Sequence, residues 1–230
     1  MSYLLKLRFV LLAVMLMAFS LTVFAAEKAG IVLKSTGKSQ IVSLEGESRV
    51  LKSKSAIFVG DKVLTGSGAQ VFIRMLDKTK MIVRENSEVL IAEFEYKKEK
   101  NDKHKTSLLK GALRAISGEI GKRSAKNVEY VAGTATIGIR GTDIDVAIIV
   151  DGQTDRAGVY NFVRDGMTEV ALATGETVLV EKDKAGFIPK TPRPGEPLLQ
   201  VLDDRPAFLS GSGFDTLMQQ LTNPRVPAIR

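Results

Sequence analysis

The chain has 230 residues, of which 44% are hydrophobic and 26% are charged, a composition typical of a globular protein rather than of a disordered or multi-span membrane protein. It has no cysteine and one histidine, which excludes disulfides, thiolate metal sites, cysteine nucleophiles and sites that need two imidazole groups. The net charge of +7 permits attraction to anionic partners, but only 6% of residues are aromatic, so we expect no nucleic-acid binding.

The N-terminal segment has the pattern of a secretory signal peptide, because Lys6 and Arg8 precede an uncharged apolar run over residues 9–24. We expect cleavage near Ala25 and a periplasmic or secreted product. Removal of residues 1–25 would leave 31 basic and 26 acidic residues, a net charge of +5. The alternative is an uncleaved anchor, because the run is only slightly shorter than the roughly 20 residues that span a bilayer as a helix.

From residue 30 to residue 188, apolar and polar residues alternate, and turn-forming residues interrupt the pattern about every 8 to 12 residues. This spacing favours an all-β fold over βαβ units. We expect an elongated β-sandwich or irregular β-solenoid of many short strands, after an N-terminal signal helix. The predicted strands cover residues 30–33, 39–44, 63–64, 69–76, 80–84, 88–96, 107–117, 128–131, 135–139, 143–150, 157–163, 168–173 and 176–181.

We divide the chain into a signal peptide (1–25), a β domain (26–188) and a Pro-rich linker with a C-terminal tail (189–230). Four prolines within nine residues predict an extended, solvated linker. Residues 214–221 could form a short helix. We expect this tail to dock loosely or to be partly disordered.

Three segments occur in a fixed order: VGDKVLTG at residues 59–66, LKGALR at residues 109–114 and ATIGIRGTDIDV at residues 135–146. Together they resemble the FecR domain family, named for the periplasmic regulator of iron-citrate uptake, and the resemblance covers roughly residues 30–185. The sequence departs from the family where Asp77 is followed by lysine instead of glycine, and where Gly133-Thr134 replaces the usual Thr-Pro.

The residues of these motifs are interpreted as structural. Glycine permits a positive φ or a close backbone approach, and Asp or Thr can form hydrogen bonds within its own turn. The residues so assigned are Gly60, Asp61, Thr65, Gly66, Asp77, Gly111, Arg140, Gly141, Thr142 and Gly166.

Arg140 allows two interpretations. It lies between Ile139 and Gly141 and points to the face opposite Ile139. We favour a buried guanidinium that ties strands together through carbonyls or a carboxylate; the alternative is a ligand for an anion or carboxylate.

Five lysines within nine residues form a candidate anion-contact patch, which could bind an anionic glycan, phospholipid or lipopolysaccharide: Lys97, Lys98, Lys100, Lys103 and Lys105. The simpler interpretation is a solvated hairpin tip whose charge blocks edge pairing, and we favour it. His104 lies within this run without a companion ligand, so we expect a surface histidine.

No catalytic or metal-binding arrangement is predicted, and no cofactor is implied. Asp143 and Asp145 would share one face of a strand, but two carboxylates without a third are too few for a calcium site. Glu93 and Glu95 cannot be distinguished from an exposed strand face. The sequence has neither a nucleophile elbow nor a phosphate-binding glycine loop. We therefore expect a protein that is not an enzyme.

These observations favour a non-catalytic exported FecR-domain protein that binds an envelope protein or an anionic glycan. The first alternative is a signal-transducing periplasmic regulator. The resemblance implies that such regulators carry a cytoplasmic anti-sigma segment and one membrane span before the FecR domain, whereas few residues precede the apolar run here. The second alternative is a polysaccharide-binding or structural envelope component. The oligomeric state is not predicted.

Overall fold

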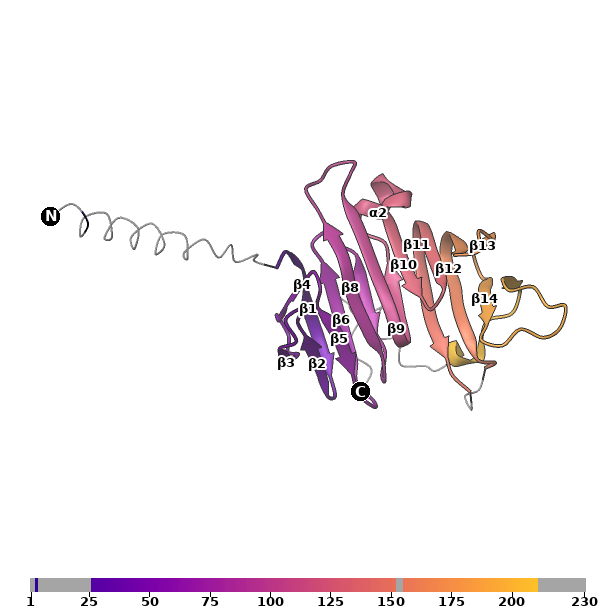
Figure 1. Cartoon of the computed structure of the whole chain (residues 1–230), viewed down its shortest axis with the longest axis horizontal. Helices are drawn as coiled ribbons and strands as arrows, with labels where there is room; N and C mark the ends of the chain where they lie inside the picture. The colour runs from indigo at the N-terminus through magenta and orange to yellow at the C-terminus, as the bar shows by residue number, and fades with distance from the viewer. Residues whose placement is uncertain (1–2, 4–25, 152–154, 211–230) are drawn as a thin grey trace, which may run out of the picture.

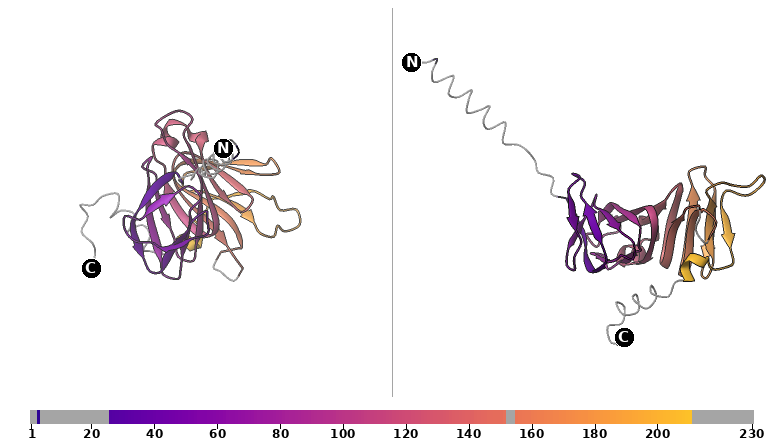
Figure 2. Two further views of the ribbon diagram at one scale, coloured as in Figure 1. Left: turned by 60° about the vertical axis from the view of Figure 1, so that its left-hand side comes forward. Right: turned by 90° about the horizontal axis from the view of Figure 1, so that it is seen from below.

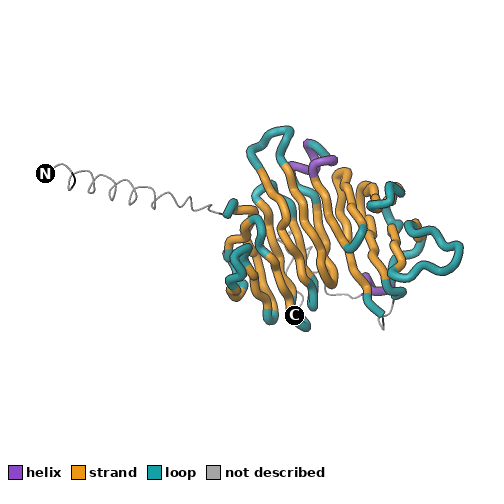
Figure 3. Tube along the Cα trace, in the orientation of Figure 1, coloured by secondary structure: helices purple, strands orange, loops and turns teal. Residues whose placement is uncertain are grey.

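The computed structural model describes residue 3, residues 26–151 and residues 155–210 (Figure 1). Strands make up most of this part, which confirms the prediction of an all-β fold (Figure 3). The expected signal helix and residues 214–221 lie outside the described residues. The strands are β1 (Lys28–Thr36), β2 (Ser39–Val42), β3 (Ser48–Val50), β4 (Ala56–Phe58), β5 (Lys62–Thr65), β6 (Gln70–Met75), β7 (Lys80–Val83), β8 (Glu88–Glu95), β9 (Lys103–Ile116), β10 (Val128–Ala132), β11 (Ala135–Ile149), β12 (Gly158–Leu172), β13 (Thr177–Glu181), β14 (Ala185–Pro189) and β15 (Gln200–Leu202).

Helical structure is short in the same ranges. It consists of α2 (Glu119–Arg123) and the 3₁₀ turns η1 (Ala125–Asn127) and η2 (Ala207–Ser210). Within the described ranges, no helix is long and apolar enough to cross a membrane.

All the strands belong to one hydrogen-bonded sheet that folds over itself into two layers (Figure 2). The first layer contains β4, β1, β6 and β7, the C-terminal half of β9 and of β11, the N-terminal half of β12, then β14 and β15. The second layer contains β3, β2, β5 and β8, the N-terminal half of β9, then β10, the N-terminal half of β11, the C-terminal half of β12, and β13. Three long strands therefore belong to both layers.

Each of these three strands passes from one layer to the other at a glycine with positive φ. The angles are +77° at Gly111 of β9, +63° at Gly141 of β11 and +80° at Gly166 of β12. A Cβ on Gly166 would lie 2.8 Å from the carbonyl oxygen of Gly141, so these two bends fit against each other with no room for a side chain. L-residues rarely adopt such angles, which explains why glycine stands at the bends.

The main core lies between the layers. Alternate residues of each strand point inward, so that Val32, Ile73 and Val146 of the first layer belong to the same buried cluster as Ile137 and Val170 of the second. The outer face of the first layer carries three smaller apolar clusters. Segment η2 packs there, with Leu209 against Phe162 and Ala185.

The structure differs from the predicted elements in three ways. Residues 135–139 and 143–150, predicted as two strands, form one strand, because β11 bends at Gly141 without ending. Residues 157–163 and 168–173, also predicted as two strands, lie largely in the single strand β12, which bends at Gly166. Strands β3, β4 and β14 and helix α2 were not predicted. The segment after residue 188, predicted as linker and tail, contains β15, which pairs with β14 and extends the sheet.

Candidate functional site

A surface groove of about 670 Å³ lies where α2 and η1 meet β11 and β12. One wall is the Gly-Ile-Arg-Gly motif of β11, which brings Arg140 to the groove together with Lys122 and Lys126. The residues that line the groove include one carboxylate, and none of them has a hydroxyl or an imidazole group. They are Gly121, Lys122, Ala125, Lys126, Gly138, Ile139, Arg140, Gly141 and Glu169.

Arg140 is exposed, and the prediction of a buried guanidinium is wrong. Its side chain is 63% exposed, and its Nη2 lies 3.8 Å from Oε2 of Glu169, which is itself 47% exposed. The strand pattern correctly places Arg140 on the face opposite Ile139. That face is the outer surface of the second layer, where no described strand or helix covers the side chain. Arg140 is therefore available to a ligand.

Arg114 is buried and Arg164 is half-buried, and each pairs with an aspartate. Arg114 forms two hydrogen bonds to Asp143, with Nε–Oδ1 at 2.8 Å and Nη2–Oδ2 at 2.6 Å. Arg164 donates from Nε to Oδ2 of Asp145, whose residue is 1% exposed. Burial raises the pKa of Asp145 to about 6, and the charge and hydrogen bond of Arg164 oppose the shift. This cluster was missed by the sequence analysis, which considered the two aspartates only as a calcium pair.

The geometry argues against that calcium pair, because both carboxylates accept hydrogen bonds from arginine. No group of three potential metal ligands occurs in the part of the chain that the structure describes.

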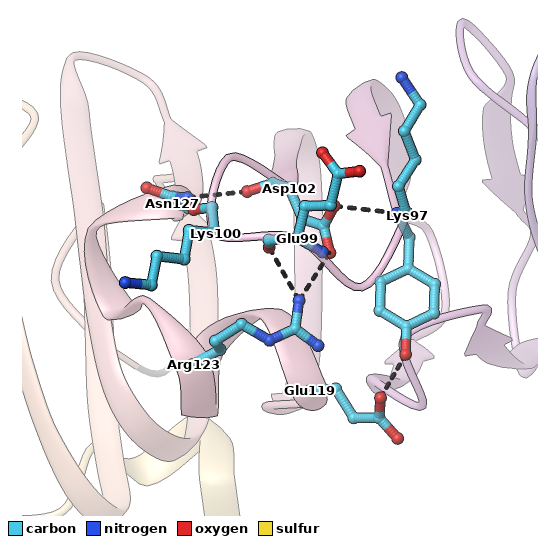
Figure 4. A network of polar contacts seen from close by, with 8 residues as sticks. Lys97, Glu99, Lys100, Asp102, Glu119, Arg123 and Asn127 are labelled. Carbon is cyan, nitrogen blue, oxygen red and sulfur yellow. Dashed lines mark hydrogen bonds and ion pairs between the residues drawn. The ribbon is translucent and has the colours of Figure 1, made fainter.

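The lysine-rich segment is a turn between β8 and β9 that is held by Asp102 (Figure 4). The buried Asp102 carboxylate accepts hydrogen bonds from Lys97 N at 2.9 Å, Glu99 N at 3.0 Å and Arg123 Nη1 at 2.8 Å. Asn127 Nδ2 donates to the Asp102 carbonyl at 2.9 Å. Burial alone would raise the pKa of Asp102, but these hydrogen bonds outweigh it and lower the pKa. The network connects the turn to α2 and η1, which line the groove.

The lysine side chains of this segment point outward. Four are exposed and Lys105 is half-buried. Lys97 pairs with Glu95 at 2.5 Å and Lys105 with Glu129 at 3.4 Å. A second cavity of about 240 Å³ is lined by Lys103, Lys105 and Lys126 among others. Lys126 lines both cavities, but the smaller cavity also contains Glu93 and Glu129, so its lining is of mixed charge.

His104 is buried, and the prediction of a surface histidine is wrong. The residue is 1% exposed, with its ring 5.5 Å from that of Phe94 and 5.7 Å from that of Tyr130. Its Nε2 lies 2.9 Å from Thr106 Oγ1. Burial lowers the pKa of His104, and the charge of Asp77 opposes that effect. His104 alternates with outward-pointing lysines along β9, so it faces the core.

Several motif residues make the polar contacts of turns. Asp61 Oδ2 accepts from Phe58 N at 2.8 Å and from Arg49 Nη2 at 3.0 Å. Thr65 Oγ1 accepts from Ser87 N at 2.9 Å.

Further motif residues lie at other turns and bends. The Asp77 carboxylate accepts from Thr79 N at 3.0 Å, and Thr142 N donates to Ser117 Oγ at 2.7 Å. Lys78, at the position where the family has glycine, has φ of +69°. Gly60 has φ of +87°, and Gly66 N donates to the Lys38 carbonyl at 2.9 Å.

The family model described as "FecR protein" matches residues 61–176 of the chain. The chain belongs to the FecR family. The matched range begins at Asp61 and extends past the end of β12, so it contains the lysine segment, the three bending glycines and the groove residues of β11 and β12. The first four strands and the last three lie outside the FecR match.

The FecR chain is also similar to solved structures. One, described as a cell surface anchoring domain, is 34% identical over 27% of this chain and 82% of its own length, with a TM-score of 0.27. Two crystal structures of a candidate anti-sigma factor from Parabacteroides distasonis ATCC 8503 are 10% and 12% identical, over 69% and 70% of this chain, each with a TM-score of 0.47. The chain spans 64% of the length of each of these two proteins. No curated protein matches the FecR chain.

Proposed function

We propose that this FecR-family protein is a non-catalytic binding module of the cell envelope, and that it binds a carboxylate-rich segment of another envelope protein in the groove beside Arg140. The observation that carries the proposal is the exposure of Arg140 within the family motif, between two lysines and a single weakly paired glutamate.

The groove has the chemistry of a carboxylate site. The planar guanidinium of arginine donates parallel hydrogen bonds to a carboxylate. The contact of Arg140 with Glu169 is long and exposed, so a ligand carboxylate can replace it at little cost in free energy. Lys122 and Lys126 add positive charge from α2 and η1.

A protein partner fits this surface better than a glycan. The described lining of the groove has no aromatic ring against which a sugar could stack. The exposed Lys103, in the cavity next to the groove, could contact a further acidic side chain of an extended segment. The proposal places the protein in the periplasm or outside the cell, as the leader pattern predicts.

The test is affinity capture from an envelope fraction with the wild-type protein and with Arg140→Ala and Lys126→Ala. Arg74→Ala is the matched control, because Arg74 is an exposed strand arginine far from the groove motif in the sheet order. We expect both groove variants to lose the captured protein while melting like the wild type, and the control to retain it.

Equal capture by all three variants would refute the groove as the binding site. Binding of polygalacturonate by the wild type but not by Arg140→Ala, without a captured protein, would replace the protein partner with an anionic polysaccharide.

Family membership supports a signalling role as a second candidate. In that case the bound envelope protein would be the input, and a separate membrane protein would carry the signal. Transcript profiles of a strain carrying Arg140→Ala in the chromosomal gene distinguish the two roles. A signalling protein should change the expression of a defined gene set, whereas a structural binding module should not.

A further inference from the structure

Strand β13 is the longest open edge of the sheet in the part of the chain that the structure describes (Figure 1). Four described strands have a neighbouring strand on one side only, and they are β3, β4, β13 and β15. Three of them have three residues each, whereas β13 has five. Proteins limit pairing at sheet edges with short strands, lysine or proline. The sequence of β13, Thr-Val-Leu-Val-Glu, contains neither lysine nor proline, so this edge is open to another strand.

The hydrogen-bond pattern shows which backbone groups of β13 face the open edge. Leu172 N donates to the Glu176 carbonyl at 2.9 Å, so the backbone of Glu176 is directed toward β12. Along an antiparallel strand, successive residues direct their backbone groups to opposite sides. The even-numbered residues of β13 therefore bond to β12, and the odd-numbered residues direct their N–H and C=O groups to the open edge. They are Thr177, Leu179 and Glu181. Of these groups, the Glu181 carbonyl already accepts from Lys184 N at 3.2 Å, in the turn that follows.

Apolar side chains lie at the middle of this edge, on both faces of the strand. Leu179 is 55% exposed on the outer face of the second layer, beside Glu169 of β12. On the opposite face, Val180 is fully buried, whereas Val178 packs against the main core but is only half-buried. A strand added to β13 would remove apolar surface of Leu179 and Val178 from water, which favours association.

The sequence of this edge is complementary to itself when two copies run antiparallel. With Leu179 opposite Leu179 of the second copy, Thr177 lies opposite Glu181. Both pairs join odd-numbered residues, whose backbone groups face the edge, so this register allows the hydrogen bonds of an antiparallel ladder. One position further along, the exposed Glu176 lies opposite the exposed Lys182. Two-fold symmetry repeats this pairing of opposite charges, so the edge matches a second copy in hydrogen bonding, apolar contact and charge.

We propose that β13 forms the interface of a homodimer, in which two copies pair antiparallel with Leu179 at the two-fold axis. Lys182 is available for this pairing, because its Nζ lies 3.8 Å from Oδ1 of Asp165, a long and exposed contact that can be exchanged at little cost in free energy. The second layers of the two copies then form one continuous sheet, with both Arg140 side chains on its outer face. A single pair of short strands buries little area, so we expect a weak dimer. The proposal does not depend on what the groove binds.

The absence of cysteine from the chain allows a direct test by cross-linking of protein purified from its host. In the proposed register the Cα atoms of the two Leu179 residues lie about 5.5 Å apart, within the range of a disulfide. Thr177→Cys is the matched control, because its two copies would lie four residues apart along the strands, roughly 13 Å. After mild oxidation we expect about five-fold more disulfide-linked dimer, or better, with Leu179→Cys than with Thr177→Cys. Equal yields, or no linked dimer from either variant, would overturn the proposal.

The register itself has a separate test. Neither Thr177→Cys nor Glu181→Cys should cross-link alone, but a mixture of the two variants should form linked dimers, because these residues lie opposite each other. A mixture that stays unlinked would overturn the proposed register.

A second measurement does not depend on cross-link geometry. Glu176→Lys and Lys182→Glu each place like charges opposite each other, and each should raise the Kd of the dimer about three-fold or more. The double variant restores opposite charges with their positions exchanged, so it is the control and should associate like the wild type. Analytical ultracentrifugation over a concentration series measures these constants. A wild type that stays monomeric at every concentration, or a double variant as weak as the single ones, would overturn the proposal.

Discussion

Arg114 and Asp143 form a bidentate ion pair between β9 and β11, at the centre of the outer face of the first layer. Their side chains are 10% and 18% exposed. Asp143 lies two residues after the bend at Gly141, so the bend sets the position of its carboxylate relative to the guanidinium of Arg114. The ion pair therefore fixes the bent part of β11 against β9, and β9 itself bends between the layers at Gly111.

Arg114→Ala should lower the free energy of unfolding by about 3 kcal/mol, the lower end of the range for a buried ion pair, because the substitution leaves the largely buried Asp143 carboxylate without its partner. Arg114→Lys should restore little, since an ammonium group cannot form both parallel bonds. Arg140→Ala is the control and should change stability by no more than about 0.5 kcal/mol, as an exposed, solvent-screened side chain. Urea unfolding of the three variants measures these differences, and similar losses for Arg114→Ala and Arg140→Ala would contradict the assignment.

Gly111 should tolerate a side chain less well than other glycines with positive φ. A Cβ there would lie 2.2 Å from Ser87 Oγ and 2.7 Å from Ser87 Cα, whereas a Cβ on Gly68, with φ of +65°, would meet nothing within 4 Å. We expect Gly68→Ala to lower the free energy of unfolding by about 1 to 2 kcal/mol, from backbone strain alone. Gly111→Ala should lower it by about 1 to 3 kcal/mol more, because its Cβ would also overlap Ser87. Thermal unfolding of both variants tests this, and equal losses would show that Ser87 can move aside.

The strand series was predictable because inward and outward residues alternate, and a period of two persists wherever one face of a strand is buried. The two-layer arrangement was not predictable, since a glycine with positive φ can end a strand or bend it. Gly141 bends β11, and only the hydrogen-bonded register with β9 and β12 shows that the strand continues.

Arg140 and Arg114 show the same limit for the site. Both alternate with apolar neighbours, so the sequence places each on the face away from the main core. Whether that face is covered depends on segments distant in the chain, and it is covered at Arg114 but not at Arg140. His104, in contrast, could have been found, because the alternation Lys103-His104-Lys105-Thr106 already places it on the inward face.

Asp102→Ala should destabilise the lysine-rich turn. The buried Asp102 carboxylate accepts three hydrogen bonds. Their loss in Asp102→Ala should lower the free energy of unfolding by about 1 to 3 kcal/mol. Because the pKa of Asp102 is lowered in the folded state, its contribution is complete above the ordinary aspartate pKa and disappears as pH falls through the folded value. Urea unfolding at pH 7 tests the loss, with the exposed Asp165→Ala as the control. A loss no larger than that of the control would contradict a structural role for the network.

His104 should make the protein less stable in mild acid. Burial lowers its pKa in the folded state, so the unfolded chain, with a histidine pKa near 6.5, takes up the proton first. The free energy of unfolding therefore falls as pH decreases from 7.5 through 6.5 toward the folded pKa, by at most about 1.4 kcal/mol per pH unit from this group.

The measurement compares the wild type with His104→Gln, which cannot titrate but can still form a hydrogen bond with Thr106. Urea unfolding at pH 7.5 and pH 5.5 should show a larger loss on acidification for the wild type than for the variant. The raised pKa of Asp145 acts in the opposite direction, because a buried carboxylate gains stability on protonation, but it is present in both proteins and cancels in the comparison. Asp77 and Tyr130, which face His104, are likewise unchanged. Parallel pH dependence in the two proteins would show that His104 can be protonated in the folded state without a free-energy penalty, contrary to its burial between Phe94 and Tyr130.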